Sequence, residues 1–350
     1  MKILFSSYSF APNVGGIESV SAILGEKFAE AGQDVDLITE TPADKNTQRS
    51  MLNAQHSIGD VDNKYRITRR PSFWKLLRLL SWCDLLFQNN ISLRSLIPAL
   101  LLRKRVIVVH QTWLRGATGK IGWNNRIKRA LLPWVTNVAI SQAVLGHAKM
   151  SGRVIGNPYD DRVFHLLPDI VRDKDLVFLG RLVSDKGADL LLQAMKILQG
   201  DGFEPDLTII GSGPEEENLR RIVRDLGLDR QVTFAGQKSG HELAELLNRY
   251  RILVVPSRWP EPFGIVALEG IACGCVVVGS QDGGLKEAIG PCGLTFENGN
   301  AHALAARLKE VLGNSEKTTS LRRAAQTHLN RFKAQTVATT YCELLENSRP

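Results

Sequence analysis

Residues 1–39 run MKILFSSYSFAPNVGGIESVSAILGEKFAEAGQDVDLIT and contain the clearest architectural signal of the chain. Residues 2–7 form an apolar run that predicts a strand, residues 18–31 predict a helix closed by Gly32, and residues 35–39 predict a second strand. A strand, a helix and a second strand in this order form a βαβ unit with parallel strands. The chain is therefore expected to begin with a strand of a parallel sheet and not with a secretion signal.

The same alternation continues along the chain and indicates two sheets. A second βα series starts at Asp175, and short apolar strands between helices are typical of parallel sheets covered on both faces. We expect an α/β protein with two doubly wound Rossmann-like domains, at residues 1–160 and 170–330, facing each other across a cleft. The linker is expected near residues 160–174, and a C-terminal helix at about 331–350 can pack back on the first domain. Further strands are expected at 85–88, 106–109, 136–140, 153–155, 207–210, 232–235, 252–255 and 275–278, with a helix near 93–102.

The composition limits the cellular compartments in which the protein is expected. A chain of 350 residues with 43% apolar residues is long enough for two cores. Its five cysteines are odd in number and lack the paired spacing of a zinc site, so we expect reduced thiols in a cytoplasmic protein. An uninterrupted apolar run of about 18 residues, which a membrane span requires, is missing from the sequence. Any membrane contact is therefore expected to be peripheral, at the inner face of the cell membrane.

The net charge of +8 is concentrated in the first half of the chain. Between Lys64 and Arg129 there are 15 basic residues and a single acid, Asp84. Residues 72–82 can form a short helix with Trp74, Leu77 and Leu80 near one face, which is typical of a helix at an anionic membrane surface. An equally open interpretation is that the leucines pack on the sheet and the basic residues are ordinary surface. A nucleic-acid partner is not expected, because the sequence contains no aromatic stacking run and no recognisable binding module.

Chemistry is predicted most strongly between residues 256 and 269, PSRWPEPFGIVALE. Glu261 and Glu269 lie on either side of a Phe-Gly turn that follows an apolar strand, so Glu269 falls about one turn inside the next helix. Two carboxylates in this arrangement can hold two separate sets of hydroxyl groups on one ligand. The start of the helix between them, at Phe263, Gly264 and Ile265, offers amides and a partial positive charge that suit a diphosphate.

With this motif the sequence resembles the retaining nucleotide-sugar glycosyltransferases of family four, also called the group 1 glycosyltransferases, which have the GT-B fold. The resemblance implies that Glu261 contacts the hydroxyls of the donor sugar and Glu269 the ribose of the nucleotide. It also implies a retaining transfer from a nucleotide-sugar donor. The sequence does not specify the base or the sugar; we expect a UDP-sugar, and a glycan or lipid-linked acceptor of cell-envelope or exopolysaccharide synthesis. It covers nearly the whole chain and is strongest from 175 to 300.

A second motif, FLGRLVSDKG at residues 178–187, places two cations around a turn that follows a strand. Arg181 and Lys186 can both reach one diphosphate and stabilise the charge that develops on a leaving group without a metal. The sequence is equally compatible with two solvent-exposed cations that bind no ligand. The resemblance to the Gly-Arg-Leu and Lys-Gly signature of the family favours the phosphate role.

Three further positions are candidate site residues. Gly15 and Gly16 precede the first helix and resemble the Gly-Gly-x-Glu loop of the family, while a simple turn with Glu18 in the first helical turn explains the same letters. His110 ends an apolar strand, where a buried structural histidine is the ordinary case and the family places an active-site histidine; Gln111 follows where the family often has Asp. Gly211 ends another strand, and the resemblance places it near the nucleotide.

No cofactor and no metal are expected. Asp34 and Asp36 have the letters of a metal-binding D-x-D motif but fall within the alternation of the second strand. Two alternatives stay open at this point: a GT-B-fold nucleotide-sugar 2-epimerase, and a non-catalytic protein that binds a sugar nucleotide. The presence of His110, Arg181, Lys186 and Glu261 together favours the transferase.

Overall fold

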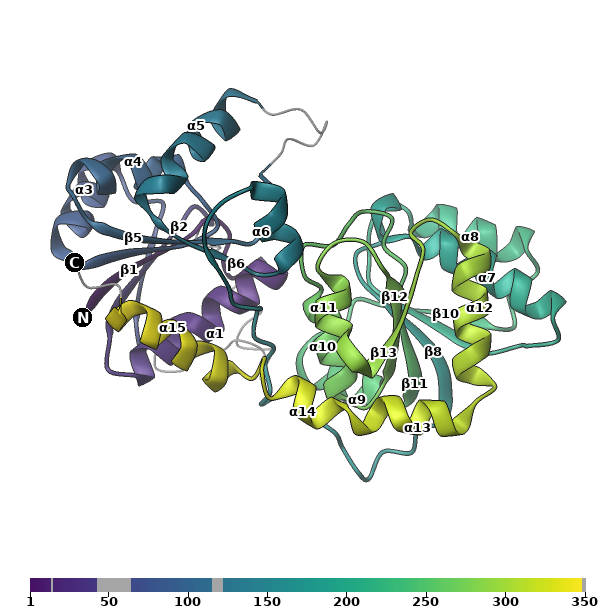
Figure 1. Ribbon diagram of the computed structural model, residues 1–350. Coiled ribbons are helices and arrows are strands. Elements are labelled where there is room, and N and C mark those ends of the chain that lie inside the picture. The colour runs from purple at the N-terminus through teal and green to yellow at the C-terminus, as the bar shows by residue number, and fades with distance from the viewer. Residues whose placement is uncertain (14, 43–63, 115–121, 348–350) are drawn as a thin grey trace. The chain divides into compact units, whose positions relative to one another are not determined.

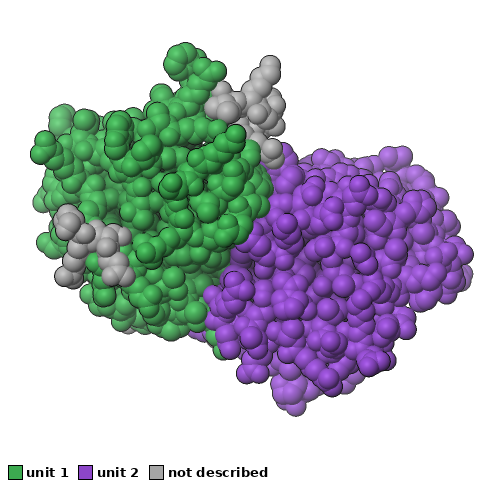
Figure 2. Space-filling view, viewed as in Figure 1, with its two compact units in different colours: residues 1–159, 333–350 green, residues 160–332 purple. Residues whose placement is uncertain are grey.

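The computed structural model describes residues 1–13, 15–42, 64–114 and 122–347. The chain divides into two compact units, each with its own sheet (Figure 2). Unit 1 comprises Met1–Tyr159 and Lys333–Pro350, and unit 2 comprises Asp160–Phe332. In the described part of the chain, no helix combines the length and apolar character needed to cross a membrane.

The described residues of unit 1 form a sheet of seven parallel strands. These are β1 (Lys2–Ser7), β2 (Asp34–Thr39), β3 (Arg66–Arg69), β4 (Leu85–Asn89), β5 (Arg105–His110), β6 (Thr136–Ala139) and β7 (Arg153–Val154). Their order across the sheet is β3-β2-β1-β4-β5-β6-β7. The strands β1 to β3 are added toward one edge of the sheet and β4 to β7 toward the other, so the strand order reverses between the parallel neighbours β1 and β4. Side chains at the carboxyl ends of the strands near this reversal lie where doubly wound folds bind ligands.

Helices cover both faces of this sheet (Figure 1). They are α1 (Gly16–Glu30), α3 (Phe73–Trp82), α4 (Leu93–Leu101), α5 (Trp123–Leu131), the short 3-10 helix η1 (Leu132–Trp134), α6 (Gln142–Ala148) and α15 (Ala334–Asn347). Right-handed crossovers place α1 on one face and α3, α4, α5 and α6 on the other. One apolar cluster joins side chains of α3, α4, η1 and α6 with residues of β1, β4 and β5, which agrees with this placement.

The last helix, α15, packs beside α1 although more than 300 residues separate them. The ring of Tyr341 is buried at 6.3 Å from Phe28 and 5.4 Å from Phe87, both measured between ring centroids. Arg105 of β5 also donates a hydrogen bond of 2.7 Å to the backbone carbonyl of Leu345. The end of the chain therefore completes the core of unit 1.

Unit 2 contains a parallel sheet of six strands in the order β10-β9-β8-β11-β12-β13. The strands are β8 (Lys174–Leu179), β9 (Leu207–Ile210), β10 (Val232–Gly236), β11 (Tyr250–Val255), β12 (Val276–Ser280) and β13 (Gly293–Phe296). The helices are η2 (Ser184–Lys186), α7 (Ala188–Gly200), α8 (Glu216–Asp225), α9 (Gly240–Asn248), α10 (Ile265–Ala272), α11 (Leu285–Ile289), η3 (Gly290–Cys292), α12 (Ala301–Leu312), α13 (Ser315–Arg323) and α14 (Ala325–Leu329).

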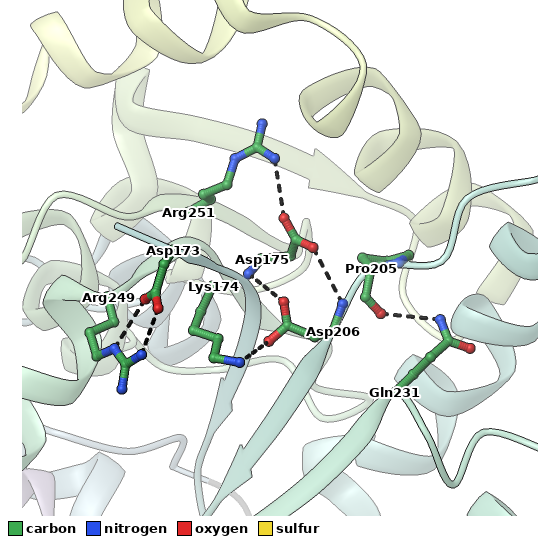
Figure 3. A network of polar contacts seen from close by, with 8 residues as sticks. All are labelled: Asp173, Lys174, Asp175, Pro205, Asp206, Gln231, Arg249 and Arg251. Atoms are coloured by element: carbon green, nitrogen blue, oxygen red, sulfur yellow. Dashed lines mark hydrogen bonds and ion pairs between the residues drawn. The ribbon is translucent and has the colours of Figure 1, made fainter. Parts of the chain in front are cut away.

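Charged side chains tie together the amino ends of the central strands of unit 2 (Figure 3). Asp173 accepts two hydrogen bonds from Arg249, of 3.0 and 2.7 Å, and Asp175 accepts one of 3.1 Å from Arg251. The backbone amides of Asp175 and Asp206 each donate to the carboxylate of the other. Because most of these pairs are partly exposed, they fix strand register more than they add stability.

The expected strands are present, with two additions and one difference. The strands β3 and β13 were not expected from the sequence; Arg66–Arg69 is a short half-exposed edge strand without an apolar run. The stretch at 160–174, expected as a linker, is partly anchored to unit 2. Arg172 donates hydrogen bonds to the backbone carbonyls of Tyr250 and Cys273, the latter at 2.8 Å.

Candidate functional site

The loops that follow β8 and β11 lie against each other at the carboxyl edge of the unit 2 sheet. The backbone amides of Arg258 and Trp259 donate to the carbonyl of Asp185, at 2.8 and 3.3 Å. Gly187 makes this approach possible: its φ is +70°, and a Cβ there would lie 2.0 Å from the carbonyl oxygen of Pro256. The Lys-Gly pair of the sequence motif thus has a steric cause.

The approach of the two loops joins Lys186 to Glu261. The Lys186 Nζ lies 2.6 Å from Glu261 Oε1, and the same oxygen accepts a hydrogen bond of 2.6 Å from Ser257 Oγ. The Glu261 side chain is 13% exposed and that of Lys186 is 27% exposed, so the pair is shielded but open to solvent on one side. Two residues 75 positions apart, both predicted from sequence, therefore form one charged pair.

Arg181 lies on the same strand-ending loop as Lys186, directly after β8. Its side chain is exposed and, among the described residues, it has neither an ion-pair partner nor a hydrogen-bond partner. Lys186 has Glu261 as its ion-pair partner, whereas the positive charge of Arg181 is left available to a ligand. This edge of the sheet can therefore receive an anionic ligand.

The start of α10 adds a second positive feature beside the pair. Gly264 is its N-cap with φ of +102°, and the helix begins at Ile265 without a side-chain cap and without an acid in its first turn. The positive end of the helix dipole is thus not neutralised locally. Phe263, in contrast, is buried with its ring 5.6 Å from that of Phe332, so its side chain belongs to the core.

Glu269 lies one turn inside α10, as expected. Burial, with a smaller contribution from the nearby Asp160 carboxylate, raises the pKa of Glu269 from 4.5 to about 7. A carboxyl group with this pKa is partly protonated near neutral pH. It can donate a hydrogen bond to a ligand oxygen as well as accept one from a ligand hydroxyl.

Gly211 closes the gap between the loops that follow β8 and β9. Its φ is +144°, and a Cβ there would lie 1.9 Å from the carbonyl oxygen of Gly180. The backbone of Gly211 donates to the carbonyl of Gly236 at 2.8 Å. The geometry explains the glycine by packing of neighbouring loops, and a contact with a nucleotide remains a prediction.

His110 of unit 1 ends β5 and is completely buried. The Nδ2 of Asn137 donates to the carbonyl of Leu132 at 2.9 Å, so its Oδ1 is the acceptor that faces His110 Nε2 at 3.0 Å. His110 Nε2 therefore carries the proton, and burial lowers the pKa of the ring. The remaining nitrogen, Nδ1, is buried and has no hydrogen-bond partner among the described residues.

Gln111, which the resemblance left without a role, is part of a buried amide network. Its side chain and that of Asn157 exchange two hydrogen bonds, of 2.9 and 2.7 Å, and its Nε2 also donates to Asn89 Oδ1 at 2.7 Å. Asn89 in turn donates to Ser21 Oγ of α1. The network connects the carboxyl ends of β4 and β5 to α1 and to the segment that leaves unit 1.

The loop before α1 is held by Glu18. Its Oε1 accepts a hydrogen bond of 2.6 Å from Ser9 Oγ, and the carboxylate also lies over Gly15, where an added Cβ would be 2.6 Å from Glu18 Oε2. Gly15 is the N-cap of α1 and Gly16 its first residue. Both the structural and the ligand-binding interpretations of this loop fit that geometry.

Asp34 and Asp36 are engaged within the sheet. Arg66 of β3 donates hydrogen bonds of 2.8 Å to Asp34 and 3.4 Å to Asp36, and Thr68 donates one of 3.0 Å to Asp36. The two carboxylates therefore pin the edge strand β3 to β2. The sequence analysis gave no role to Ser257, Asn137 and Asn157, which were recognisable only by their positions near strand ends.

The site in unit 2 and the strand orders define a class of protein. Residues 168–328, nearly all of unit 2, match the family described as glycosyl transferases group 1. The recognition from the motifs at 178–187 and 256–269 is confirmed. The chain has the GT-B fold: the crystal structure of HepE from Anabaena in complex with UDP matches with a TM-score of 0.82, over 99% of this chain and 100% of that chain, at 20% identity.

Sequence relatives match over shorter stretches. An uncharacterized glycosyltransferase of Methanocaldococcus jannaschii is 42% identical over 118 residues, which is 33% of this chain and 30% of the relative. Glycogen synthase of Mycobacterium tuberculosis is 35% identical over 173 residues, which is 49% of this chain and 42% of the relative. The chain thus spans less than half the length of these curated relatives.

Proposed function

We propose that this protein is a retaining, metal-independent glycosyltransferase that moves a hexose-type sugar from a nucleotide-sugar donor to a glycan or lipid-linked acceptor. The observation that carries the proposal is the Lys186–Glu261 pair, which lies next to the uncapped start of α10 at the carboxyl edge of the unit 2 sheet. Together with the family of unit 2, this pair supports binding of a ligand that is anionic at one end and rich in hydroxyl groups at the other.

Departure of a nucleoside diphosphate from a sugar concentrates negative charge on the leaving oxygens. Arg181, Lys186 and the α10 N-terminus are cationic or partly positive groups that would stabilise this charge in the transition state. Lys186 also holds Glu261, whose second oxygen, Oε2, would accept hydrogen bonds from the sugar hydroxyls. Glu269 would bind the ribose hydroxyls.

Retention of the anomeric configuration follows from the family resemblance. In this mechanism the donor phosphate accepts the proton of the acceptor on the same face of the sugar, so no protein nucleophile is needed. Lys186 and Ser257 both bond to Glu261 Oε1, which holds this carboxylate in place for contacts of Oε2 with the sugar hydroxyls. For His110 we propose a contact with the sugar or the acceptor through Nδ1, which can accept a hydrogen bond but cannot donate one.

The preferred donor is a UDP-sugar. HepE of Anabaena, which has the same fold, was crystallised with UDP and with UDP-glucose. The acceptor is proposed to belong to cell-envelope or exopolysaccharide synthesis.

Release of nucleotide from UDP-, GDP- and ADP-sugars by the purified protein tests the proposal. Lys186→Ala should lower kcat by about 100-fold, the scale of one lost transition-state contact. Lys196→Ala, on the outer surface of α7, is the matched control and should leave kcat unchanged. Near wild-type turnover by a folded Lys186→Ala protein, or an epimerised donor as the product, would contradict the assignment.

Metal independence gives a separate prediction. Because two cations and a helix terminus would face the diphosphate of the proposed donor, EDTA should leave the transfer rate within about twofold of the untreated rate. The measurement is the initial rate in EDTA and after addition of Mn²⁺. A rate that vanishes in EDTA and returns with Mn²⁺ would overturn this part of the mechanism, and an inverted anomeric product would overturn retention.

A further inference from the structure

The two helical faces of the unit 1 sheet carry opposite charge. On one face, α3, α4, α5 and α6 contain six basic residues and no acid. On the other face, α1 and α15 contain five acids and one basic residue. The basic residues are Lys75, Arg78, Arg94, Arg126, Lys128 and Arg129. The charge asymmetry is therefore a property of the folded sheet and not only of the sequence.

The same side also exposes large apolar side chains. Trp74 of α3 is 78% exposed, Leu101 of α4 is 79% exposed, and Trp123 of α5 is 80% exposed. Ile97 and Leu102 are exposed beside Leu101. None of the exposed large apolar residues in the described part of unit 1 lies in α1 or α15. Apolar side chains gathered on one face indicate an interaction surface.

Helix α5 is the most unusual element of this side. None of its residues is buried, although its sequence is amphipathic. Trp123 and Ile127 are exposed one turn apart, and Trp134 of η1, which continues α5 directly, is 70% exposed. Arg126 places its guanidinium 5.9 Å from the centre of the Trp123 ring. The exposed apolar side chains of α5, with Arg126 beside Trp123, thus face away from the protein.

The inward-facing side chains of α3 and α4 pack in the apolar core of unit 1. Leu76, Leu79 and Leu80 of α3 are buried, which corrects the expectation that Leu80 shares an outward face with Trp74. Leu77 is partly exposed. We call the outward side of α3, α4, α5 and η1 the basic face.

We propose that the basic face docks on an anionic membrane surface. Indole and aliphatic side chains surrounded by Arg and Lys are suited to the boundary between lipid headgroups and acyl chains. A nucleic acid fits less well, because Ile97, Leu101, Leu102 and Ile127 cannot stack on bases as aromatic rings do. The proposal goes beyond sugar transfer, because docking requires neither donor nor turnover.

Co-sedimentation of the whole protein with vesicles tests the proposal. Wild-type protein should bind vesicles that contain phosphatidylglycerol, bind phosphatidylcholine vesicles at least about tenfold more weakly, and dissociate as salt rises. Trp123→Ser combined with Trp134→Ser should weaken binding about tenfold or more, and so should Lys75→Ser combined with Arg78→Ser. Because these positions are exposed, the substitutions should leave the fold intact, and circular dichroism verifies this.

Two controls separate this proposal from the proposed function. Lys196→Ser with Arg224→Ser removes the same charge from exposed helix positions of unit 2 and should leave vesicle binding unchanged. Lys186→Ala should bind vesicles normally although it loses turnover, and the basic-face variants should keep donor hydrolysis. Failure to bind anionic vesicles at low salt, equal weakening by the unit 2 control, or tighter binding to tRNA than to vesicles would each overturn the proposal.

Discussion

At the scale of single residues, the environment of a side chain decides what its chemical group can do. Glu261 and Glu269 have the same side chain and lie eight positions apart. Glu261 is ion-paired with Lys186, whereas Glu269 is partly buried and lies near a second carboxylate, Asp160. The first carboxylate has a cation as its partner, whereas burial raises the pKa of the second to about 7.

The raised pKa of Glu269 makes stability depend on pH. Between pH 4.5 and about 7 the folded protein holds a proton on Glu269 that the unfolded chain has released. Stability from this group is therefore present at low pH and declines as pH rises through about 7, by about 3 kcal/mol in total.

Glu269→Gln should remove this dependence. The comparison is urea unfolding of wild-type and variant protein at pH 5 and pH 8, where all other titrating groups are shared. From pH 5 to pH 8, the free energy of unfolding of the variant should rise relative to that of the wild type by about 3 kcal/mol. An unchanged difference between the two proteins at both pH values would show that Glu269 titrates normally.

At the scale of elements, glycines bring strand-ending loops together and so assemble the site. Gly187 allows η2 to touch the loop after β11, which sets the distance between Lys186 and Glu261.

Gly187→Ala should therefore impair both folding and activity. The new Cβ would meet the carbonyl oxygen of Pro256 at a backbone φ of +70°, which should cost about 1–3 kcal/mol and lower kcat/KM by about tenfold or more. Gly202→Ala is the matched control, because φ is +81° there but nothing lies within 4 Å of the added Cβ. It should cost about 1 kcal/mol and leave kcat/KM unchanged. Equal activity losses in the two variants would refute the role of loop contact.

At the scale of the whole molecule, the last helix closes the first core. The Tyr341 ring packs edge-on against Phe28 of α1 and Phe87 of β4. A segment near residue 340 thus stabilises a sheet that begins at residue 2.

Tyr341→Ala should destabilise unit 1 by about 3–5 kcal/mol, the usual cost of removing a buried aromatic ring. Tyr341→Phe keeps the ring and should stay within about 1 kcal/mol of the wild type. Thermal and urea unfolding measure both values. A small loss for Tyr341→Ala would mean that α15 does not contribute to this core.

The sequence by itself determined the local and periodic features. Apolar runs separated by helical segments predicted two parallel α/β domains, because strand and helix patterns depend on neighbouring residues. The Glu-Pro-Phe-Gly and Gly-Arg-Leu motifs indicated the family that residues 168–328 match. Short edge strands such as β3 were not predicted, because half-exposed residues have no apolar pattern.

Only the tertiary structure decided which distant residues meet. The hydrogen bonds between Lys186 and Glu261, between His110 and Asn137, and between Gln111 and Asn157 each join positions at least 27 residues apart. Charge also became meaningful only in the fold, because right-handed crossovers sort the basic helices to one face of the sheet and the acidic helices to the other. Packing across the sheet has no counterpart in local sequence pattern, and for this reason a sequence pattern cannot specify it.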